Sequence, residues 1–291
     1  MYNKNFINLN KFSIGTAQIG MKYGVNNKTG KIKYKEAKKI ISLARKKGIK
    51  SIDTAYQYSD GEKILGKIGV NDFKITSKIP YIKKEEIYKI KFYLKKSLKN
   101  LKVNHLECVL IHHPLNLKKN TKKIYEELIN LKKNGLVKKI GVSITDFNDI
   151  YKILDKYNFD TIQVPHNILD HRLMNKRLIK LIRKKNITIE VRSIFLQGLL
   201  FKNIDFINNK FKKIFFDWKL LNFFFKKTEN KKLEYMVNFV YQNKLIKKII
   251  IGVDNQNQLI DISKIIRKKI IIKKKISCQN SKIINPNLWK E

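Results

Sequence analysis

Short apolar runs alternate with longer amphipathic, lysine-rich segments along almost the whole chain. The short runs are rich in Ile, Val and Phe, which are residue types that favour β-strands. The longer segments repeat apolar residues at three- and four-residue spacing, as Ala37, Ile40 and Ile41 do, which predicts helices with one buried face. Glycine or proline follows several segments, as Gly48 and Pro80 do, and marks their ends.

The order of these segments predicts the fold class. Strands are expected at residues 12–17, 49–55, 73–79, 106–112, 137–143, 161–164, 187–194 and 248–253. Helices are expected at residues 33–47, 60–68, 84–100, 121–134, 146–157, 173–185, 229–243 and 255–268. Eight strand–helix units without a strong linker favour an α/β fold, a closed (β/α)8 TIM barrel, which commonly takes about 250 residues.

We expect one domain over residues 1–291, with the barrel at about 11–268 and a C-terminal tail at 269–291. A doubly wound open sheet is the alternative fold. It is disfavoured because no Gly-x-Gly-x-x-Gly fingerprint follows the first strand, where a dinucleotide-binding sheet of that type carries it.

Charge is the unusual feature of the composition. The chain has 64 Lys and Arg against 23 Asp and Glu, a net charge of +41. Such an excess can serve binding to nucleic acid or to an anionic membrane. The lysines, however, are spread along nearly every predicted helix, which is typical of a solvated surface, and Lys, Ile and Asn are abundant together, as in A- and T-rich genomes. We therefore expect a small-molecule substrate and neither a specific nucleic-acid partner nor a membrane.

The cysteine spacing, the N-terminal residues and the length of the apolar runs bear on the cellular compartment. Cys108 and Cys278 form no spacing motif and fit a reduced protein better than a disulfide scaffold. The first ten residues lack the apolar run of a signal peptide. The isoleucine run at 270–272 is flanked by lysines and is far shorter than the ~20 apolar residues of a membrane helix. A cytoplasmic protein is the expectation.

Polar residues stand at or near the ends of the predicted strands, where parallel barrels carry their active sites. Asp53 lies near the end of the second predicted strand, and Tyr58 follows five positions later. Lys78 lies near the end of the third, and His112 ends the fourth. We expect these four side chains to share one cavity. Later strands place Ser143, Gln163, Arg192, Ser193 and Asp254 in corresponding positions.

Together the four residues can transfer a proton during reduction of a carbonyl. The reaction needs a hydride donor and a proton for the developing alkoxide. A free tyrosine, with a pKa near ~10, is a poor acid at neutral pH, but a nearby ammonium favours loss of its proton. Asp53 would hold Lys78, Lys78 would tune Tyr58, Tyr58 would donate the proton and His112 would orient the substrate oxygen. Each residue alone also has a structural explanation, so the hypothesis depends on the ordered set.

Motifs at these positions resemble those of a known family. In order they are Asp53-Thr-Ala-x-x-Tyr58 with Glu62, Thr76-Ser-Lys78, Leu110-Ile-His112-x-Pro114, Gly141-Val-Ser143, Gln163 with Asn167, Gly198, and Ile250-Ile-Gly252. With them the chain resembles the aldo-keto reductases over about residues 11–265. The resemblance implies a (β/α)8 barrel, NADPH as cofactor, and the catalytic roles given above.

The same resemblance implies the cofactor contacts. Ser143 and Gln163 are expected to hold the nicotinamide carboxamide. Further cofactor-binding residues are expected at Arg192, Ser193, Gly198, Gly252, Asp254 and Gln258. The segments 15–24, 191–200 and 285–289 resemble a bacterial branch often associated with surface-polysaccharide and sugar-nucleotide pathways, which suggests a sugar-derived carbonyl.

Three positions depart from the family pattern. Ile144 stands where an asparagine usually follows the strand-five serine. Arg192 replaces an aromatic that stacks on the nicotinamide, and its guanidinium can stack on a ring or meet a substrate carboxylate or phosphate. After Gly252, relatives that prefer NADPH often carry Lys or Arg, whereas Asp254 can repel a 2′-phosphate or accept from a 2′-hydroxyl. NADPH is therefore the expected cofactor, with NADH as the alternative.

Two other functions are compatible with the sequence. One is a non-catalytic NADPH-binding barrel that acts as a sensor or partner subunit. The other is a metal-dependent hydrolase built on His112, His113, His166 and His171 with Asp53. Only the adjacent histidine pair is closely spaced, and its side chains should leave a strand on opposite faces, so no metal is expected. The aromatic stretch 215–225 is expected to pack in the core or to form a lid.

Overall fold

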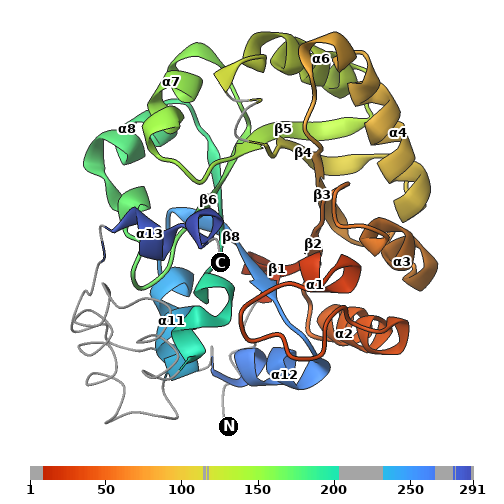
Figure 1. The fold of residues 1–291 in the computed structure, drawn as a ribbon, viewed down its shortest axis with the longest axis vertical. Coiled ribbons are helices and arrows are strands. Elements are labelled where there is room, and N and C mark those ends of the chain that lie inside the picture. The colour runs from red at the N-terminus through yellow and green to blue at the C-terminus, as the bar shows by residue number, and fades with distance from the viewer. Residues whose placement is uncertain are drawn as a thin grey trace, which may run out of the picture.

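Eight parallel strands form the centre of the molecule. The structure, a computed structural model, describes residues 9–113, 116, 118–202, 232–265, 278 and 280–289. The strands pair in sequence order, and β8 pairs back to β1, which closes the barrel. Helices surround the strands on the outside (Figure 1). The structure thus confirms the predicted (β/α)8 barrel.

The strands are short and are buried along most of their length. Their apolar residues are mostly β-branched, as at Ile14, Ile52 and Val109, and a strand covered on both faces tolerates few polar side chains. The strands are β1 (Phe12–Gly15), β2 (Ser51–Asp53), β3 (Lys74–Ile79), β4 (Leu106–Ile111), β5 (Val137–Ser143), β6 (Thr161–Pro165), β7 (Thr188–Arg192) and β8 (Ile246–Gly252).

The helices follow the predicted periodicity. In α2, Ala37, Ile40, Ile41 and Ala44 face the core, and the lysines between them face solvent. The helices are α1 (Ala17–Gly20), α2 (Tyr34–Lys46), α3 (Gly61–Ile68), α4 (Lys89–Leu101), α6 (Thr121–Lys133), α7 (Asn148–Lys156), α8 (Lys176–Lys184), α11 (Lys232–Tyr241), α12 (Gln256–Ile265) and α13 (Ser281–Ile284). Within the described ranges, no helix has the length and apolar character to cross a membrane.

Two predicted helices are divided in the structure. The segment expected at 84–100 is a 3-10 turn (Lys84–Glu86) followed by α4, and Tyr88 is exposed between them. The segment expected at 173–185 is a 3-10 turn (Arg172–Met174) followed by α8. The side chain of Asn175 caps α8 by accepting from the Leu178 N–H, which fixes the start of the helix there.

Three predicted strands also have different ends in the structure. The strand expected at 187–194 ends at Arg192, because Ser193 has a φ of +57°, which a strand cannot accommodate. The strand expected at 106–112 ends at Ile111, so His112 and His113 lie beyond it. The strand expected at 49–55 is limited to Ser51–Asp53.

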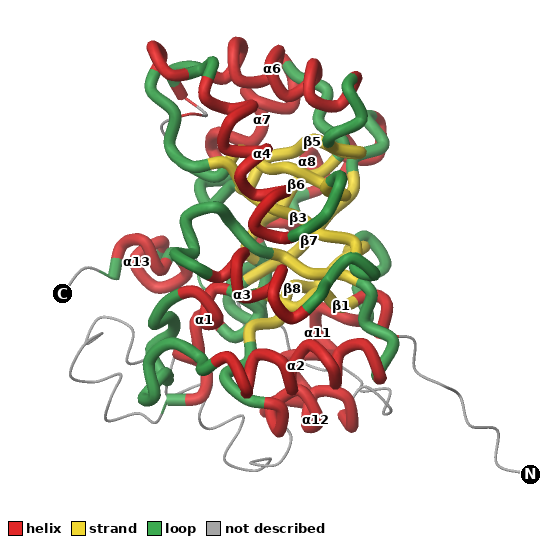
Figure 2. The backbone as a smooth tube through the Cα atoms, turned by 90° about the vertical axis from the view of Figure 1, so that its right-hand side faces the viewer, coloured by secondary structure: helices red, strands yellow, loops and turns green. Residues whose placement is uncertain are grey.

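The C-terminal segment packs against the loops of the later strands. Cys278, Ile283 and Ile284 form a second apolar cluster with Ile168 and Leu199. Helix α13 lies on the same side of the barrel as α1 (Figure 2). This helix was not predicted, since the helix at 255–268 was expected to be the last. The aromatic stretch 215–225, Pro114 and the isoleucine run at 270–272 lie outside the described residues.

Candidate active site

A cavity of about 920 Å³ opens at the carboxyl ends of the strands. All four predicted catalytic residues line it, namely Asp53, Tyr58, Lys78 and His112. So do seven of the predicted cofactor contacts, Gln163, Arg192, Ser193, Gly198, Gly252, Asp254 and Gln258. Ser143 does not line it and lies behind its wall, with 4% of its surface exposed.

An ion pair between Lys78 and Asp53 lies at the base of the cavity. Strands β2 and β3 are neighbours in the barrel, which brings the two residues together. Lys78 Nζ donates to Asp53 Oδ1 at 2.5 Å and to the Thr54 carbonyl oxygen at 2.8 Å. Burial opposes the charge on Lys78, but the attraction of Asp53 and Tyr58 outweighs it and raises the pKa of the ammonium. Lys78 is therefore charged at neutral pH.

Tyr58 lies in the loop that follows β2, close to this ion pair. The ammonium nitrogen of Lys78 is 5.5 Å from the centroid of the Tyr58 ring. Close packing holds the loop, because a Cβ placed on Gly20 would lie 1.8 Å from the Tyr58 carbonyl oxygen. Only glycine fits at that position of α1, and the Gly61 N–H also donates to the same oxygen at 2.8 Å. The backbone of Tyr58 is therefore fixed beside Lys78.

His112 completes the group of four. Its ring meets the Tyr58 ring edge-on, with 6.4 Å between the centroids and 86° between the planes. Burial, with the charges of Lys78 and Arg192 added to it, lowers the pKa of His112 to about 3. The imidazole is therefore neutral at neutral pH, and it can orient an oxygen through a hydrogen bond but is a poor source of a proton.

A buried polar chain runs from this group across the barrel. Gln163 Nε2 donates to Asp53 Oδ2 at 2.8 Å and to Glu190 Oε2 at 3.3 Å. Lys248 Nζ lies 3.7 Å from Glu190 Oε1. Burial raises the pKa of the Glu190 carboxyl, and the charge of Lys248 partly offsets this. Both donated bonds use the amide nitrogen of Gln163; its oxygen accepts from the Ser143 hydroxyl at 3.5 Å and has a second lone pair that could accept from a ligand's N–H.

Arg192 extends from the end of β7 along the cavity wall. Its Nη2 donates to Thr145 Oγ1 at 2.7 Å, and its Nε donates to the hydroxyl of Ser143 at 3.4 Å. The Ser143 hydroxyl in turn donates to Gln163 Oε1 at 3.5 Å. Ser143 thus contacts two predicted cofactor residues although it does not reach the cavity itself.

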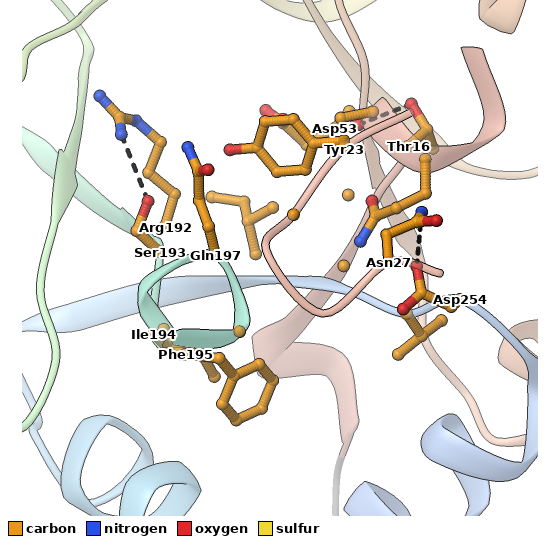
Figure 3. Close-up of a pocket in the computed structure, with 18 of the residues that line it drawn as sticks. Thr16, Tyr23, Asn27, Asp53, Arg192, Ser193, Ile194, Phe195, Gln197 and Asp254 are labelled. Atoms are coloured by element: carbon orange, nitrogen blue, oxygen red, sulfur yellow. Dashed lines mark hydrogen bonds between the residues drawn. The ribbon is translucent and has the colours of Figure 1, made fainter. Parts of the chain in front are cut away.

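The loop that follows α1 crosses the cavity. The Val25 N–H donates to the Gln197 carbonyl oxygen at 2.9 Å, and Asn26 Nδ2 donates to the Gly198 carbonyl oxygen at 2.6 Å. Asn27 Nδ2 donates to Asp254 Oδ1 at 3.3 Å. Figure 3 shows Arg192 and Ser193 on one side of this loop and Asp254 on the other. The loop therefore links the β7 and β8 ends of the cavity.

Left-handed backbone marks the β7 side of the cavity. Leu196, Gln197 and Gly198 follow one another with φ values of +48°, +54° and +89°. Glycine adopts this conformation freely, whereas the two other residues hold it at a cost of roughly 1–3 kcal/mol each. Strained backbone of this kind concentrates at ligand-binding segments, and successive turns of it can form concave anion sites.

Several lining residues were not predicted. Tyr23 lies near Tyr58 and Arg192, and burial raises the pKa of its phenol. Its position shortly after the first predicted strand was the available signal. Glu190, which belongs to the buried polar chain behind the cavity, could have been found from the two-residue period of β7, since it shares a strand face with Arg192. Asn26 and Asn27 carried no periodic signal.

The histidine prediction was wrong in one respect. His112 and His113 were expected on opposite faces of a strand, yet both line the cavity, because the strand ends before them. Among the residues that the structure describes, no group of three or more His, Cys, Asp or Glu is placed to hold a metal ion.

Comparison with known proteins shows what this chain is similar to. The model of the "Aldo/keto reductase family" matches residues 11–275. A methylglyoxal reductase of Escherichia coli is 29% identical over 142 residues, which are 47% of this chain and 50% of that protein. A glyoxal reductase of Bacillus subtilis is 29% identical over 174 residues, 58% of this chain and 61% of that protein. The chain thus spans about half the length of the curated relatives it matches.

Solved structures support the fold. An aldo-keto reductase from Bacillus halodurans superposes with a TM-score of 0.71 at 18% identity, over 90% of this chain and 88% of that one. A glycerol dehydrogenase from Gluconobacter oxydans gives a TM-score of 0.69 at 20% identity, over 90% and 88%. At these identities the likeness shows a shared barrel.

Proposed function

Because this chain belongs to the aldo/keto reductase family, we propose that it reduces an aldehyde or ketone to an alcohol with a reduced nicotinamide dinucleotide. The observation that carries the proposal is that Asp53, Tyr58, Lys78 and His112 line one cavity, with Lys78 charged and His112 neutral. A sugar-derived carbonyl fits the bacterial branch that the sequence resembles. The proposed partner is thus a small molecule.

Protonation of the alkoxide is assigned to Tyr58 by elimination. His112 is neutral at neutral pH, since its pKa is about 3. Lys78 is buried, its pKa is raised, and two of its three N–H groups donate to Asp53 and the Thr54 carbonyl oxygen. Tyr58 is the remaining group of the four with a proton to give. Positioned acid catalysis of this kind is worth roughly 10²–10⁴ in rate.

The cavity has room and suitable groups for a dinucleotide. Its volume of about 920 Å³ is near the upper end of the roughly 300–1,000 Å³ common for ligand sites. Ser193 and Gly198 would hold the middle of the ligand, where left-handed backbone lines the wall. Gln163 would accept from the carboxamide at one end, and Gln258 would lie at the other. When bound, the dinucleotide supplies the hydride.

The choice between NADPH and NADH depends on the end of the cavity at Asp254. NADPH is the cofactor that the family resemblance implies, and it stays a prediction. Asp254, Asp261 and Gln258 line the cavity. Its described lining residues include one lysine, Lys78, which is paired with Asp53, and one arginine, Arg192, which lies on the side away from Asp254 (Figure 3). A 2′-phosphate beside these carboxylates would be repelled, whereas a 2′-hydroxyl could donate to one of them.

Asp254→Asn is therefore expected to improve the binding of NADPH relative to NADH by roughly 3- to 10-fold, the size expected for removing one partly screened charge. Quenching of protein fluorescence during titration with each dinucleotide gives the two dissociation constants. Asp155→Asn, on the exposed face of α7, is the matched control and should leave the ratio unchanged. An unchanged ratio in Asp254→Asn would place the 2′ position elsewhere.

The proposed activity is tested with purified protein, both dinucleotides and a carbonyl panel that includes keto-sugars and small aldehydes. We expect saturable dinucleotide binding, and oxidation of the dinucleotide that requires a carbonyl and produces the alcohol in equal amount. Tight binding without turnover of any panel member would favour the alternative function, a non-catalytic barrel that acts as a sensor or partner subunit.

We also propose that the chain works as one unit, with the barrel over about residues 11–268 and the segment 269–291 as its tail. The family match over residues 11–275 and the closed barrel support this division. Pro286, from the tail, lines the same cavity as the barrel residues.

A further inference from the structure

We propose that the carbonyl substrate carries an anionic group, a carboxylate or a phosphate, and that Arg192 binds this group inside the cavity. The inference rests on the proposed reductase function and adds the class of substrate to it. Among the described residues that line the cavity, Lys78 and Arg192 differ in how their positive charges are compensated.

The charge of Lys78 is compensated within the protein. Its ammonium pairs with the carboxylate of Asp53 at 2.5 Å, and both side chains are almost fully buried. His112 adds no charge, since its pKa of about 3 leaves it neutral at neutral pH. The group of four therefore has no net charge with the Tyr58 phenol in its protonated form.

The charge of Arg192 is not compensated in the same way. Its guanidinium donates to four neutral oxygens, those of Thr145 at 2.7 Å, Ser143 and Ser193 at 3.4 Å each, and Ile144 at 3.5 Å. Over the described ranges of the chain, no carboxylate lies within ion-pair distance of it. Arg192 is half-buried and lines the cavity, so one unpaired positive charge faces the space where a substrate must enter.

This charge lies close to the reacting groups. The field of Arg192 lowers the pKa of His112, after the larger effects of burial and of Lys78. It also acts on the phenol of Tyr23, whose pKa is raised mainly by burial. Figure 3 shows Tyr23 and Gln197 in the space between Arg192 and the Asn27 side of the cavity. A substrate held by His112 and Tyr58 through its carbonyl oxygen would thus have Arg192 within reach of its other end.

The charge of the substrate determines whether binding beside the Arg192 guanidinium is favourable. A neutral substrate would displace water from a half-buried guanidinium without replacing those interactions, which is unfavourable. A carboxylate or phosphate would replace the water with charge-assisted hydrogen bonds, and the planar guanidinium can make two in parallel. A site of this kind rejects analogues that lack the polar group more strongly than an apolar pocket rejects a change of size.

The test compares matched substrates that differ in the anionic group. Glyceraldehyde 3-phosphate is compared with glyceraldehyde, and succinic semialdehyde with butanal. We expect wild-type kcat/KM to favour the charged member of at least one pair by ~10-fold or more. In Arg192→Gln, the ratio of charged to neutral kcat/KM should fall by roughly 10- to 100-fold. Arg192→Lys keeps the positive charge but lacks the planar guanidinium. Its ratio of charged to neutral kcat/KM should lie between those of the wild type and Arg192→Gln.

Controls separate this inference from the function on which it rests. Arg183→Gln makes the same replacement on the exposed face of α8 and should leave both rates unchanged. Equal use of charged and neutral members by the wild type, or an unchanged ratio in Arg192→Gln, would overturn the inference and leave the reductase assignment intact. The inference is also overturned if Arg192→Gln weakens dinucleotide binding tenfold while the ratio stays constant, since Arg192 would then hold the cofactor. Turnover of no member of any pair would remove the reductase assignment itself.

Discussion

Replacing Tyr58 with phenylalanine is expected to lower kcat by roughly 10²–10⁴-fold, because the phenol is the group of the four that can give a proton to the alkoxide. His112 is neutral, with a pKa of about 3, and Lys78 is held as an ammonium by Asp53, so neither can take over efficiently. Removal of one hydroxyl should not disturb the fixed loop backbone. Steady-state turnover measures kcat, and a dinucleotide titration on the same preparation measures the affinity for the cofactor.

Tyr56→Phe is the matched control for this variant. Tyr56 lies in the same loop, and its ring packs edge-on against Tyr93 at 5.0 Å, but it does not line the cavity. We expect it to retain wild-type turnover. Dinucleotide binding should stay within about 2-fold of wild type in Tyr58→Phe, which would separate loss of chemistry from loss of binding. A Tyr58→Phe enzyme with most of its rate would remove Tyr58 as the acid.

Lys78→Met is expected to lower both activity and stability. The change leaves the Asp53 carboxylate buried without its cation, and breaking one side of a buried pair typically costs about 3–5 kcal/mol. Turnover should fall by at least ~10²-fold, since the ammonium beside Tyr58 is lost. Chemical denaturation and steady-state turnover measure the two effects.

Two further variants separate these effects. The double variant Asp53→Asn with Lys78→Met removes both charges and should regain part of the lost stability while it stays inactive. Lys132→Met removes a lysine that pairs with Asp160 at 2.7 Å at the surface, and it should cost at most about 1 kcal/mol and no activity. Turnover near the wild-type level in the double variant would show that the buried pair serves stability alone.

Strand ends explain how much of the site the sequence could predict. Asp53, Lys78 and His112 each follow an apolar run, and in a parallel barrel all such ends meet at one face. Once the barrel was predicted, the cavity that they share followed from topology. Their electrostatic states did not follow, because the neutral form of His112 depends on burial and on charges from two other strands.

Long-range contacts explain what was missed. The link from the loop at Asn26 and Asn27 to Gly198 and Asp254 joins residues more than a hundred positions apart, and polar loops carry no periodic signal. Gln163 was expected to hold a carboxamide, yet the side chains that occupy its amide nitrogen, Asp53 and Glu190, become visible only when the barrel is closed. The end of β7 was misplaced because Ser193 has a left-handed φ of +57°, which is uncommon for a residue other than glycine.

The most direct test of the central claim is a double-variant cycle between Tyr58 and Lys78. The claim is that the ammonium promotes the reaction through the phenol, so the two residues should act as one unit. We predict that Tyr58→Phe with Lys78→Met reduces single-turnover hydride transfer no further than Tyr58→Phe alone, at a temperature where all variants are folded. Losses that multiply in the double variant would show that Lys78 and Tyr58 act independently and would contradict the account.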